Sequence, residues 1–426
     1  MTTKLNSSSL SFRPIVLALL FLATNALAGA QTERAIHTFA GEPDGQEPYT
    51  TLVFDKAGNL YGTTIYGGTF NQGSIFKLTP SGFSWTETIL YSFGTTSADG
   101  IYPKGALVFD AKGNLYGTTT SGRSAKGSSL FQLSPPTVSG GSWTFTVLAN
   151  FELSNQGSTG PCGLLWVNGL HLFGVAPYGG NGYGSIVELA PPATSGGTWS
   201  ASTIYSFSPL TRTDGYWPGR DCAPLIADKS GNLYGTTQLG GSLAWGTVFE
   251  LSPPATSGGA WTETILHNFA DAFGNGAAPG GPVTFDANGN LYGTASGGGS
   301  NLFGVVYELS PASDGTWTFS LLYSFRTQSD DGKNPAGGVI FDKAGNMYGT
   351  TTFGVYPYPE GTIWKLAPPS TSGGKWTETV LHSFTGGPDG GEPNAGLIAG
   401  PGGALYGTTL FGGNSKRDGV VYQLVP

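Results

Sequence analysis

Six short turns that carry an acid or an amide recur along the chain, and they are the first candidates for chemistry. Each is an Asp-Gly or Asn-Gly pair with a proline three residues after the glycine, and the leading residues are Asp44, Asp99, Asp214, Asn275, Asp331 and Asp389. A ring of such carboxylates could hold Ca²⁺, which prefers carboxylate and carbonyl oxygens. The same pair also forms tight turns, and the proline fixes the backbone that follows. Because residues repeated in nearly every copy of a unit usually serve that unit, we expect turns and assign no cofactor or metal ligand. Ca²⁺ is the alternative.

A second set consists of aromatic residues beside permissive glycine backbone. Some precede a Gly-Gly pair, and others follow an Asp-Gly pair by one or two residues. Aromatic rings in such places can stack on sugar rings or hold an extended peptide. The predicted ligand-binding residues are Tyr66, Tyr102, Tyr178, Tyr216, Trp217 and Phe411. The alternative is that these rings pack against neighbouring loops.

Constellations typical of catalysis are scarce. Three of the four histidines, His37, His267 and His382, share one position of a recurring segment that elsewhere holds tyrosine, which favours packing. His171 stands alone. No His/Cys cluster has metal-ligand spacing, and the sequence has no Gly-x-Ser-x-Gly or Walker motif. We therefore assign no catalytic residue. A carboxylate pair drawn from the Asp-Gly set or from Asp221 is the alternative, and would suit an acid–base mechanism.

All these residues belong to a unit that recurs through the chain. Its clearest marker is Gly-Asn-Leu-Tyr-Gly-Thr-Thr, and copies of the marker stand at residues 58–64, 113–119, 231–237, 289–295, 345–351 and 403–409, with a degenerate copy at 169–174. Successive copies are 55–61 residues apart. A fixed period of this length predicts a repeat architecture.

Each unit contains four short segments rich in β-branched and aromatic residues and bounded by Gly, Pro, Asn or Asp, which predicts four strands. Residues 33–39 match the end of the fourth segment, and residues 419–424 match the third. The two ends of the chain therefore complete one unit. We predict an all-β, seven-bladed β-propeller with four antiparallel strands per blade, whose last blade is closed by the N-terminal strand. A parallel β-helix is the alternative, although its repeats are much shorter.

Residues 1–30 are predicted to be a secretory signal peptide. Lys4 and Arg13 precede the apolar run 15–23, and small residues place the cleavage after Ala28 or Ala30. The apolar run is short for a membrane span, although an uncleaved anchor is the alternative. The domain prediction is a signal peptide at 1–30 and a single propeller at 31–426. We expect the mature chain to be secreted to the extracellular space or the periplasm, with no transmembrane segment.

The composition of the chain limits the classes of partner that it could bind. The formal net charge is −8, only 11% of residues are charged, and no basic run occurs. Such a chain lacks the positive surface that nucleic acids require, so no nucleic-acid partner is expected. A ring of sheets that completes itself leaves no open edge, so we expect a monomer.

The only two cysteines, Cys162 and Cys222, occupy nearly matching places in neighbouring repeats. Both stand just before the first predicted strand of their unit. Neighbouring blades come closest near the axis of a propeller, and an exported chain meets an oxidising compartment. We therefore predict a disulfide between them.

The repeated Asp-Gly-x-x-Pro, Gly-Asn-Leu-Tyr-Gly-Thr-Thr and Gly-Thr-Val-Phe segments resemble those of the GloVer-type tandem-repeat proteins, also described as choice-of-anchor proteins. The resemblance covers almost everything after residue 31, and the strand layout is similar to that of NHL-type propellers. It implies an extracellular propeller and brings no reaction or catalytic residues. We predict a binding or surface-interaction module whose partner is an extracellular carbohydrate or peptide. A secreted polysaccharide lyase or hydrolase and a structural protein of the envelope or matrix are the alternatives.

Overall fold

The computed structural model describes residues 32–426 apart from 97, 121–126, 139, 152–159, 170, 193, 195–196, 209–212, 220–221, 257, 271–273, 327–330, 355–358 and 372. The predicted signal peptide and Asp221 lie outside the described residues. Gln31–Pro426 form one compact unit. None of the described residues forms a helix with the length and hydropathy needed to span a bilayer.

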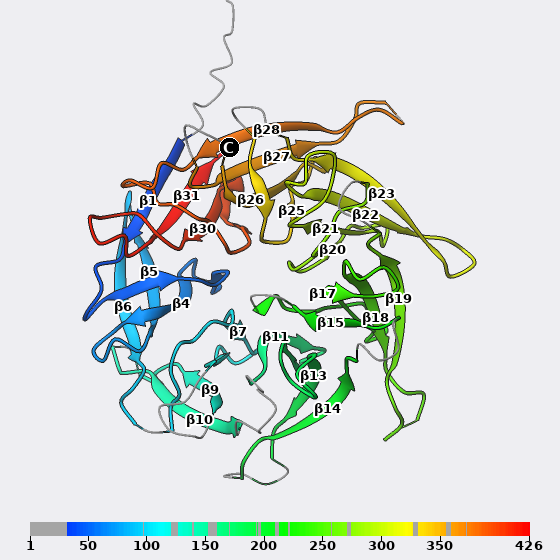
Figure 1. Ribbon diagram of the computed structural model, residues 1–426. Helices are drawn as coiled ribbons and strands as arrows, with labels where there is room; N and C mark the ends of the chain where they lie inside the picture. The colour runs from blue at the N-terminus through cyan, green and yellow to red at the C-terminus, as the bar shows by residue number, and fades with distance from the viewer. Residues whose placement is uncertain are drawn as a thin grey trace, which may run out of the picture. The chain divides into compact units, whose positions relative to one another are not determined.

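Seven antiparallel sheets follow one another around a ring (Figure 1). Blade 1 contains β2 (Gly45–Pro48), β3 (Val53–Phe54), β4 (Leu60–Gly67), β5 (Ser74–Ser81) and β6 (Ser84–Ser92). Blade 2 contains β7 (Val108–Phe109), β8 (Leu115–Thr118), β9 (Ser128–Ser134) and β10 (Thr144–Phe151). Blade 3 contains β11 (Cys162–Val167), β12 (His171–Ala176), β13 (Ser185–Ala190) and β14 (Ser200–Ser206).

The second half of the ring repeats this plan. Blade 4 contains β15 (Gly215–Pro218), β16 (Ile226–Ala227), β17 (Leu233–Gly240), β18 (Thr247–Ser252) and β19 (Thr262–Asn268). Blade 5 contains β20 (Thr284–Phe285), β21 (Leu291–Ala295), β22 (Val305–Pro311) and β23 (Trp317–Ser324). Blade 6 contains β24 (Lys333–Pro335), β25 (Ile340–Phe341), β26 (Met347–Phe353), β27 (Thr362–Ala367) and β28 (Thr377–Ser383). Blade 7 contains β29 (Ile398–Ala399), the 3₁₀ turn η3 (Pro401–Gly403), β30 (Leu405–Thr409), β31 (Val420–Val425) and β1 (Thr32–Thr38).

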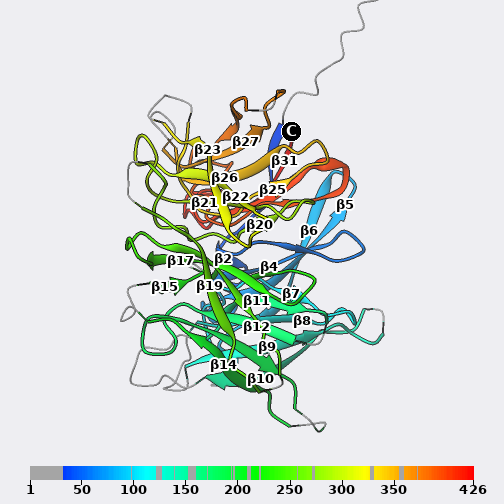
Figure 2. The same cartoon turned by 90° about the vertical axis from the view of Figure 1, so that its right-hand side faces the viewer.

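The last blade is completed by the first strand of the chain. β1 pairs antiparallel with β31, from Thr32 opposite Val425 to Thr38 opposite Val420, and the blue and red strands lie side by side in Figure 1. This pairing confirms the predicted closure and the seven-bladed propeller. Figure 2 shows the same ring turned by 90°.

The repeated marker is explained by local hydrogen bonds and packing. In blade 1, Asp55 accepts hydrogen bonds from the backbone N–H groups of Ala57 and Asn59, and from the Asn59 amide and the Tyr61 hydroxyl. A Cβ on Gly62 would come within 2.6 Å of the Phe76 ring. The Asp, Asn and Tyr of the motif therefore fix the first hairpin, and its glycine leaves room for the aromatic residue of the third strand.

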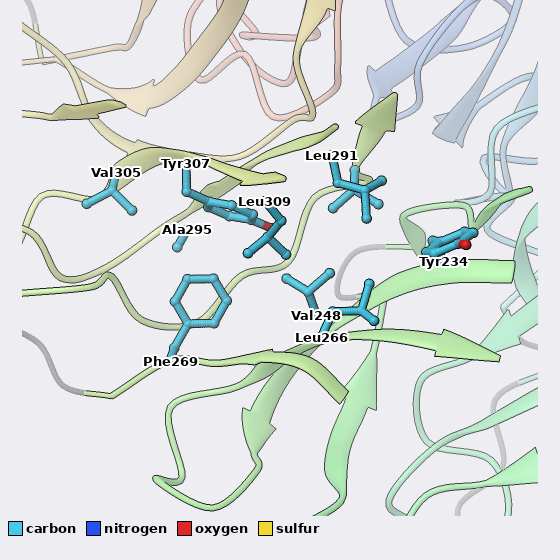
Figure 3. Packing of buried hydrophobic residues seen from close by; sticks show 10 residues of the cluster. Tyr234, Val248, Leu266, Phe269, Leu291, Ala295, Val305, Tyr307 and Leu309 are labelled. Atoms are coloured by element: carbon cyan, nitrogen blue, oxygen red, sulfur yellow. The ribbon is translucent and has the colours of Figure 1, made fainter. Parts of the chain in front are cut away.

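The hydrophobic core is divided into clusters, most of which lie between neighbouring blades. In one of them, Val248 and Phe269 of blade 4 pack with Leu291, Tyr307 and Leu309 of blade 5 (Figure 3). Each blade therefore buries its apolar surface largely against the next one, and the ring is stabilised by repeated contacts of the same kind. We call each contact between neighbouring blades a seam.

Candidate binding face

One face of the ring is built by a backbone hydrogen bond that recurs at the seams. The residue before the proline of the Asp-Gly-x-x-Pro motif donates its N–H to a carbonyl in the preceding blade, where the acceptor stands just before the glycine that begins the third strand. Six such bonds, 2.7–3.0 Å long, join Glu47 to Asp418, Tyr102 to Gln72, Trp217 to Tyr183, Ala278 to Trp245, Asn334 to Phe303 and Glu392 to Glu360. The connections from second to third strand and from fourth to first strand therefore share this face, which we call the loop face.

The donor residues at these bonds adopt the left-handed backbone conformation, with φ between 54° and 59°. Residues other than glycine rarely adopt it, but here the six donors are Glu, Tyr, Trp, Ala, Asn and Glu. The conformation recurs because the motif's backbone is held by the bond across the seam and by the proline that follows. The same backbone therefore presents a different side chain at each seam.

The six predicted ligand-binding residues lie on the loop face but fall into three groups. Tyr66 and Tyr102 meet edge to face at the seam between blades 1 and 2, with ring centroids 5.2 Å apart. At the seam between blades 3 and 4, Trp217 lies 5.9 Å from Tyr178 and 5.5 Å from Tyr216. The structure thus brings together two of these residues at one seam and three at another.

Phe411 belongs to blade 7 and contacts neither group. Its ring lies 5.4 Å from the guanidinium of Arg417, which can contribute a cation–π contact. A recess of about 270 Å³ beside it is lined by Gln46, Glu47, Phe411, Lys416 and Arg417. This recess combines an aromatic ring with charged groups of both signs.

The six predicted ligand-binding residues differ in how far their side chains are exposed to solvent. Tyr178 is 48% exposed, whereas the other five are half-buried because they pack against neighbouring loops. Trp217, for example, donates its indole N–H to the carbonyl of Gly182. Packing against neighbouring loops, the alternative considered for these rings, therefore describes most of the set. The rings are not fully buried, however, so they remain partly accessible to a ligand.

Exposed apolar residues that the sequence analysis did not single out enlarge this face. They are Phe70, Tyr183, Leu243, Trp245, Leu302 and Phe353, each between 38% and 47% exposed. All but Phe353 lie within three residues before the glycine that begins a third strand, and Phe353 ends β26. The signal that could have found them is a large apolar residue at a loop position where other copies of the repeat carry polar residues.

A cavity of about 290 Å³ runs along the axis of the ring and is lined by the segments that precede the inner strands of all seven blades. Its described lining consists largely of glycine, alanine, proline and aliphatic residues, and Lys104 is the one charged residue among them. Cys222 lies in this wall and is joined to Cys162 by a disulfide, with a Cα–Cα distance of 5.1 Å. The predicted disulfide is thus present, and it links the inner parts of blades 3 and 4.

A polar pocket of about 260 Å³ lies where the loop face meets the axis. Its lining residues come from blades 1, 5, 6 and 7, and they are Tyr49, Gly280, Ser296, Asn334, Pro335, Ala336, Thr352, Phe353, Glu392 and Asn394. Asn334 donates its amide to the carbonyl of Ser296, and the Thr352 hydroxyl donates to Asn394. Burial raises the pKa of Glu392, with a further contribution from Glu360. We call this the mouth pocket; it offers hydroxyl, amide and carboxyl groups beside the exposed ring of Phe353.

The carboxylates of the Asp-Gly motif do not line the axial cavity; they serve the turns and seams. Asp99 accepts hydrogen bonds from the Tyr91 hydroxyl at 2.8 Å and from the backbone N–H of Thr95. Asp331 accepts the Tyr323 hydroxyl and the N–H of Arg326 in the same way. These contacts agree with the turn interpretation of the motif.

Two histidines of the recurring fourth strand contact side chains at the seams, which agrees with the packing role favoured by the sequence. His267 stacks on Phe319 with ring centroids 4.2 Å apart, and burial lowers its pKa to about 4. His382 hydrogen-bonds Asp389 at 3.2 Å. His171, from the degenerate repeat, pairs with Glu188 on the surface.

Comparison with known protein families shows the family to which the chain belongs. The sequence model of the Gloeobacter/Verrucomicrobia repeat matches residues 26–225 and 142–351, which together cover most of the chain. The chain belongs to this repeat family. The Gloeobacter/Verrucomicrobia repeat is therefore the unit that folds into the blades described above, and the resemblance inferred from the motifs is confirmed. A search of the curated proteins finds no match.

Solved structures similar to this repeat protein are also propellers, at low sequence identity. The extracellular domain of a hybrid two-component system from B. thetaiotaomicron matches with a TM-score of 0.54 and 12% identity, over 92% of this chain and 42% of that chain. PorZ, a surface component of the type-IX secretion system of Porphyromonas gingivalis, matches with a TM-score of 0.48 and 16% identity, over 90% and 47%. Trypanosoma rangeli sialidase matches with a TM-score of 0.42 and 12% identity, over 93% and 60%. Such likenesses show the fold alone.

Proposed function

We propose that this protein is an exported binding module that holds carbohydrate on its loop face, with the mouth pocket as the principal site. The observation that carries the proposal is the mouth pocket itself: amides, hydroxyls and a carboxyl converge beside the exposed ring of Phe353. Sugars present hydroxyl groups that pair with such side chains, and apolar ring faces that stack on aromatic residues. The other exposed rings of the loop face, such as Tyr178 and Trp245, extend the surface available to a long glycan.

Two further observations support this proposal. The disulfide between Cys162 and Cys222 is typical of a chain that folds in an oxidising compartment, which agrees with the predicted export. The described residues of the mouth pocket include a single carboxylic acid, Glu392. Glycoside hydrolysis commonly requires two facing carboxyl groups. The described lining of the pocket therefore supports binding over the hydrolase alternative.

The first prediction tests the pocket. Phe353→Ala should weaken glycan binding about five- to twelvefold, because a stacking contact worth about 1–1.5 kcal/mol is lost. Glu392→Gln should change affinity without changing the melting temperature. The measurement is a glycan array followed by calorimetry on the best ligand, with the exported chain as reference.

Phe83→Ala is the matched control, since Phe83 is 95% exposed in the turn between β5 and β6, away from the pocket. It should bind as the reference does. An equal loss of glycan affinity in the Phe353→Ala and Phe83→Ala variants would show that the mouth pocket is not the binding site. An extended peptide that binds where no glycan does would assign the loop face to peptide recognition instead.

A further inference from the structure

Three side chains capable of binding a metal converge at the seam where the ring closes. His37 lies on β1 in blade 7, Asp44 lies in the turn before β2, and Glu87 lies on β6 in blade 1. His37 Nε2 is 3.5 Å from Asp44 Oδ2 and 3.4 Å from Glu87 Oε1. Among the described residues this is the one group of three such side chains whose ligand atoms all lie within 4.8 Å of one another. The sequence analysis considered His37 and Asp44 separately and did not group them with Glu87, because the three meet only when β1 pairs with β31 and the ring closes.

Hydrogen bonding between the Asp44 and Glu87 carboxyl groups, which needs a proton on one of them, explains only part of this convergence. His37 Nε2 and Glu87 Oε1 are both buried atoms, and neither has a hydrogen-bond partner. The three side chains retain only 17–18% of their exposure. Two carboxylates held this close, with little water, repel one another unless a cation or a proton stands between them. A proton between Asp44 and Glu87 meets this need when no ion is bound, as it does for Glu263 beside Asp214, but it leaves His37 Nε2 without a partner. A cation placed between the three side chains would bind all of them.

At several equivalent seams, the residue in the position of His37 forms a hydrogen bond to the Asp of the next motif. Where the fourth strand carries tyrosine, its hydroxyl donates to the Asp of the next motif, as Tyr91 does to Asp99 at 2.8 Å. Where it carries His382, the ring hydrogen-bonds Asp389 at 3.2 Å, and Glu33 lies farther away at 3.8 Å. The His37 seam alone among these examples brings its nitrogen equally close to two carboxylates without bonding either.

The distances fit a small divalent ion. Zn²⁺ binds imidazole nitrogen and carboxylate oxygen at about 2.0–2.2 Å, usually with tetrahedral geometry, so neighbouring ligand atoms are about 3.3–3.6 Å apart. The distances from His37 Nε2 to Asp44 Oδ2 (3.5 Å) and to Glu87 Oε1 (3.4 Å) fall in this range. Ca²⁺ would need more ligands, and oxygen ones, than this group supplies.

We propose that His37, Asp44 and Glu87 bind Zn²⁺ or a similar first-row divalent cation, which fastens blade 7 to blade 1. One nitrogen and two oxygens come from the protein, and a fourth position is left for solvent. The ion would join the N-terminal strand, already paired with β31, to the neighbouring blade. The site lies at the seam and uses no residue of the mouth pocket, so it is independent of carbohydrate binding.

The experiment is titration of the EDTA-treated, dialysed protein with ZnCl₂, followed by calorimetry and by thermal unfolding. We expect one saturable site lost in His37→Tyr, and a melting temperature that rises with Zn²⁺ because the ion binds the folded state. His37→Tyr imports the residue found at other seams, so the variant should fold with its hydroxyl donating to Asp44. Glu87→Gln should also lose the site while keeping similar volume and polarity.

His382→Tyr is the matched control, since it makes the same change at the neighbouring seam and should keep the Zn²⁺ response. CaCl₂ should produce no saturable binding that depends on His37. The proposal is overturned if Zn²⁺ leaves the melting temperature unchanged, or if binding persists undiminished in both His37→Tyr and Glu87→Gln. Persistence of that kind would place the ion elsewhere, for example at the exposed pair of His171 and Glu188.

Discussion

At the scale of single residues, two motif positions that look unrelated in the sequence prove to be one contact. The glycine that begins a third strand has a positive φ, and it faces the proline of the next blade. For Gly246, φ is 98°, and a Cβ would come within 2.7 Å of Pro279 Cδ and 2.4 Å of the Thr237 carbonyl. The sequence places Pro279 in an Asn-Gly-x-x-Pro segment and Gly246 at the start of a Gly-Thr-Val-Phe segment. It does not predict their contact, because nothing in one repeat indicates which atoms of the next repeat it will meet.

Gly246→Ala should therefore destabilise the protein by about 2–5 kcal/mol, since backbone strain and steric overlap add. Gly289→Ala is the matched control: its φ is 85°, and no atom lies within 4 Å of the added Cβ. This control should cost only the strain, about 1–2 kcal/mol. Denaturant unfolding of both variants measures the difference. Equal losses would show that the proline contact contributes nothing to the requirement for glycine.

At the scale of the blades, the seams differ in the chemistry that joins them. Between blades 3 and 4, the Tyr205 hydroxyl donates to Glu263 at 2.9 Å, close to Asp214. Burial, with the charge of Asp214, raises the pKa of Glu263 to about 8. Between blades 1 and 2 the equivalent of Glu263 is Phe145, which stacks on Tyr91 at 3.7 Å. The repeat therefore tolerates either a polar or an aromatic seam.

The polar seam makes stability depend on pH. The pKa of Glu263 is about 8 in the folded chain and ordinarily 4.5, so the folded protein keeps a proton that the unfolded chain loses. This contribution to stability is complete below pH 4.5 and falls as the pH rises from 4.5 to about 8. Glu263→Gln should flatten the decline of the melting temperature between pH 5 and pH 8, because the amide cannot ionise.

Glu263→Phe, which copies the seam of Tyr91 and Phe145, should flatten the same decline through an aromatic stack. Both variants should be more stable than the parent protein near pH 8, by on the order of 1–3 kcal/mol. Thermal unfolding across the pH range provides the measurement. A slope unchanged in both variants would mean that Glu263 ionises freely in the folded chain.

At the scale of the whole molecule, the sequence predicted the ring better than the sites on it. The period and the matching ends, residues 33–39 and 419–424, were enough for seven blades and their closure, because each blade needs a fourth strand to cover its edge. The site residues were harder to predict. Trp245 and Phe353 occupy loop positions that vary between repeats. The meeting of His37 with Asp44 and Glu87 depends on β1 pairing with β31, at the other end of the chain.

The closure itself can be tested by removing the strand that provides it. A chain that begins at residue 39 lacks β1, so the edge of β31 loses its partner and the packing around Ile36 is opened. We expect a lower melting temperature, with a loss of about 3 kcal/mol or more, and association through the exposed edge. A chain that begins at residue 32 is the control. Adding a peptide of residues 32–38 should restore a monomer, because an extended peptide can pair with an open sheet edge. A shortened chain that stays monomeric and melts at the control temperature would show that six blades and the three remaining strands of blade 7 hold the ring without β1.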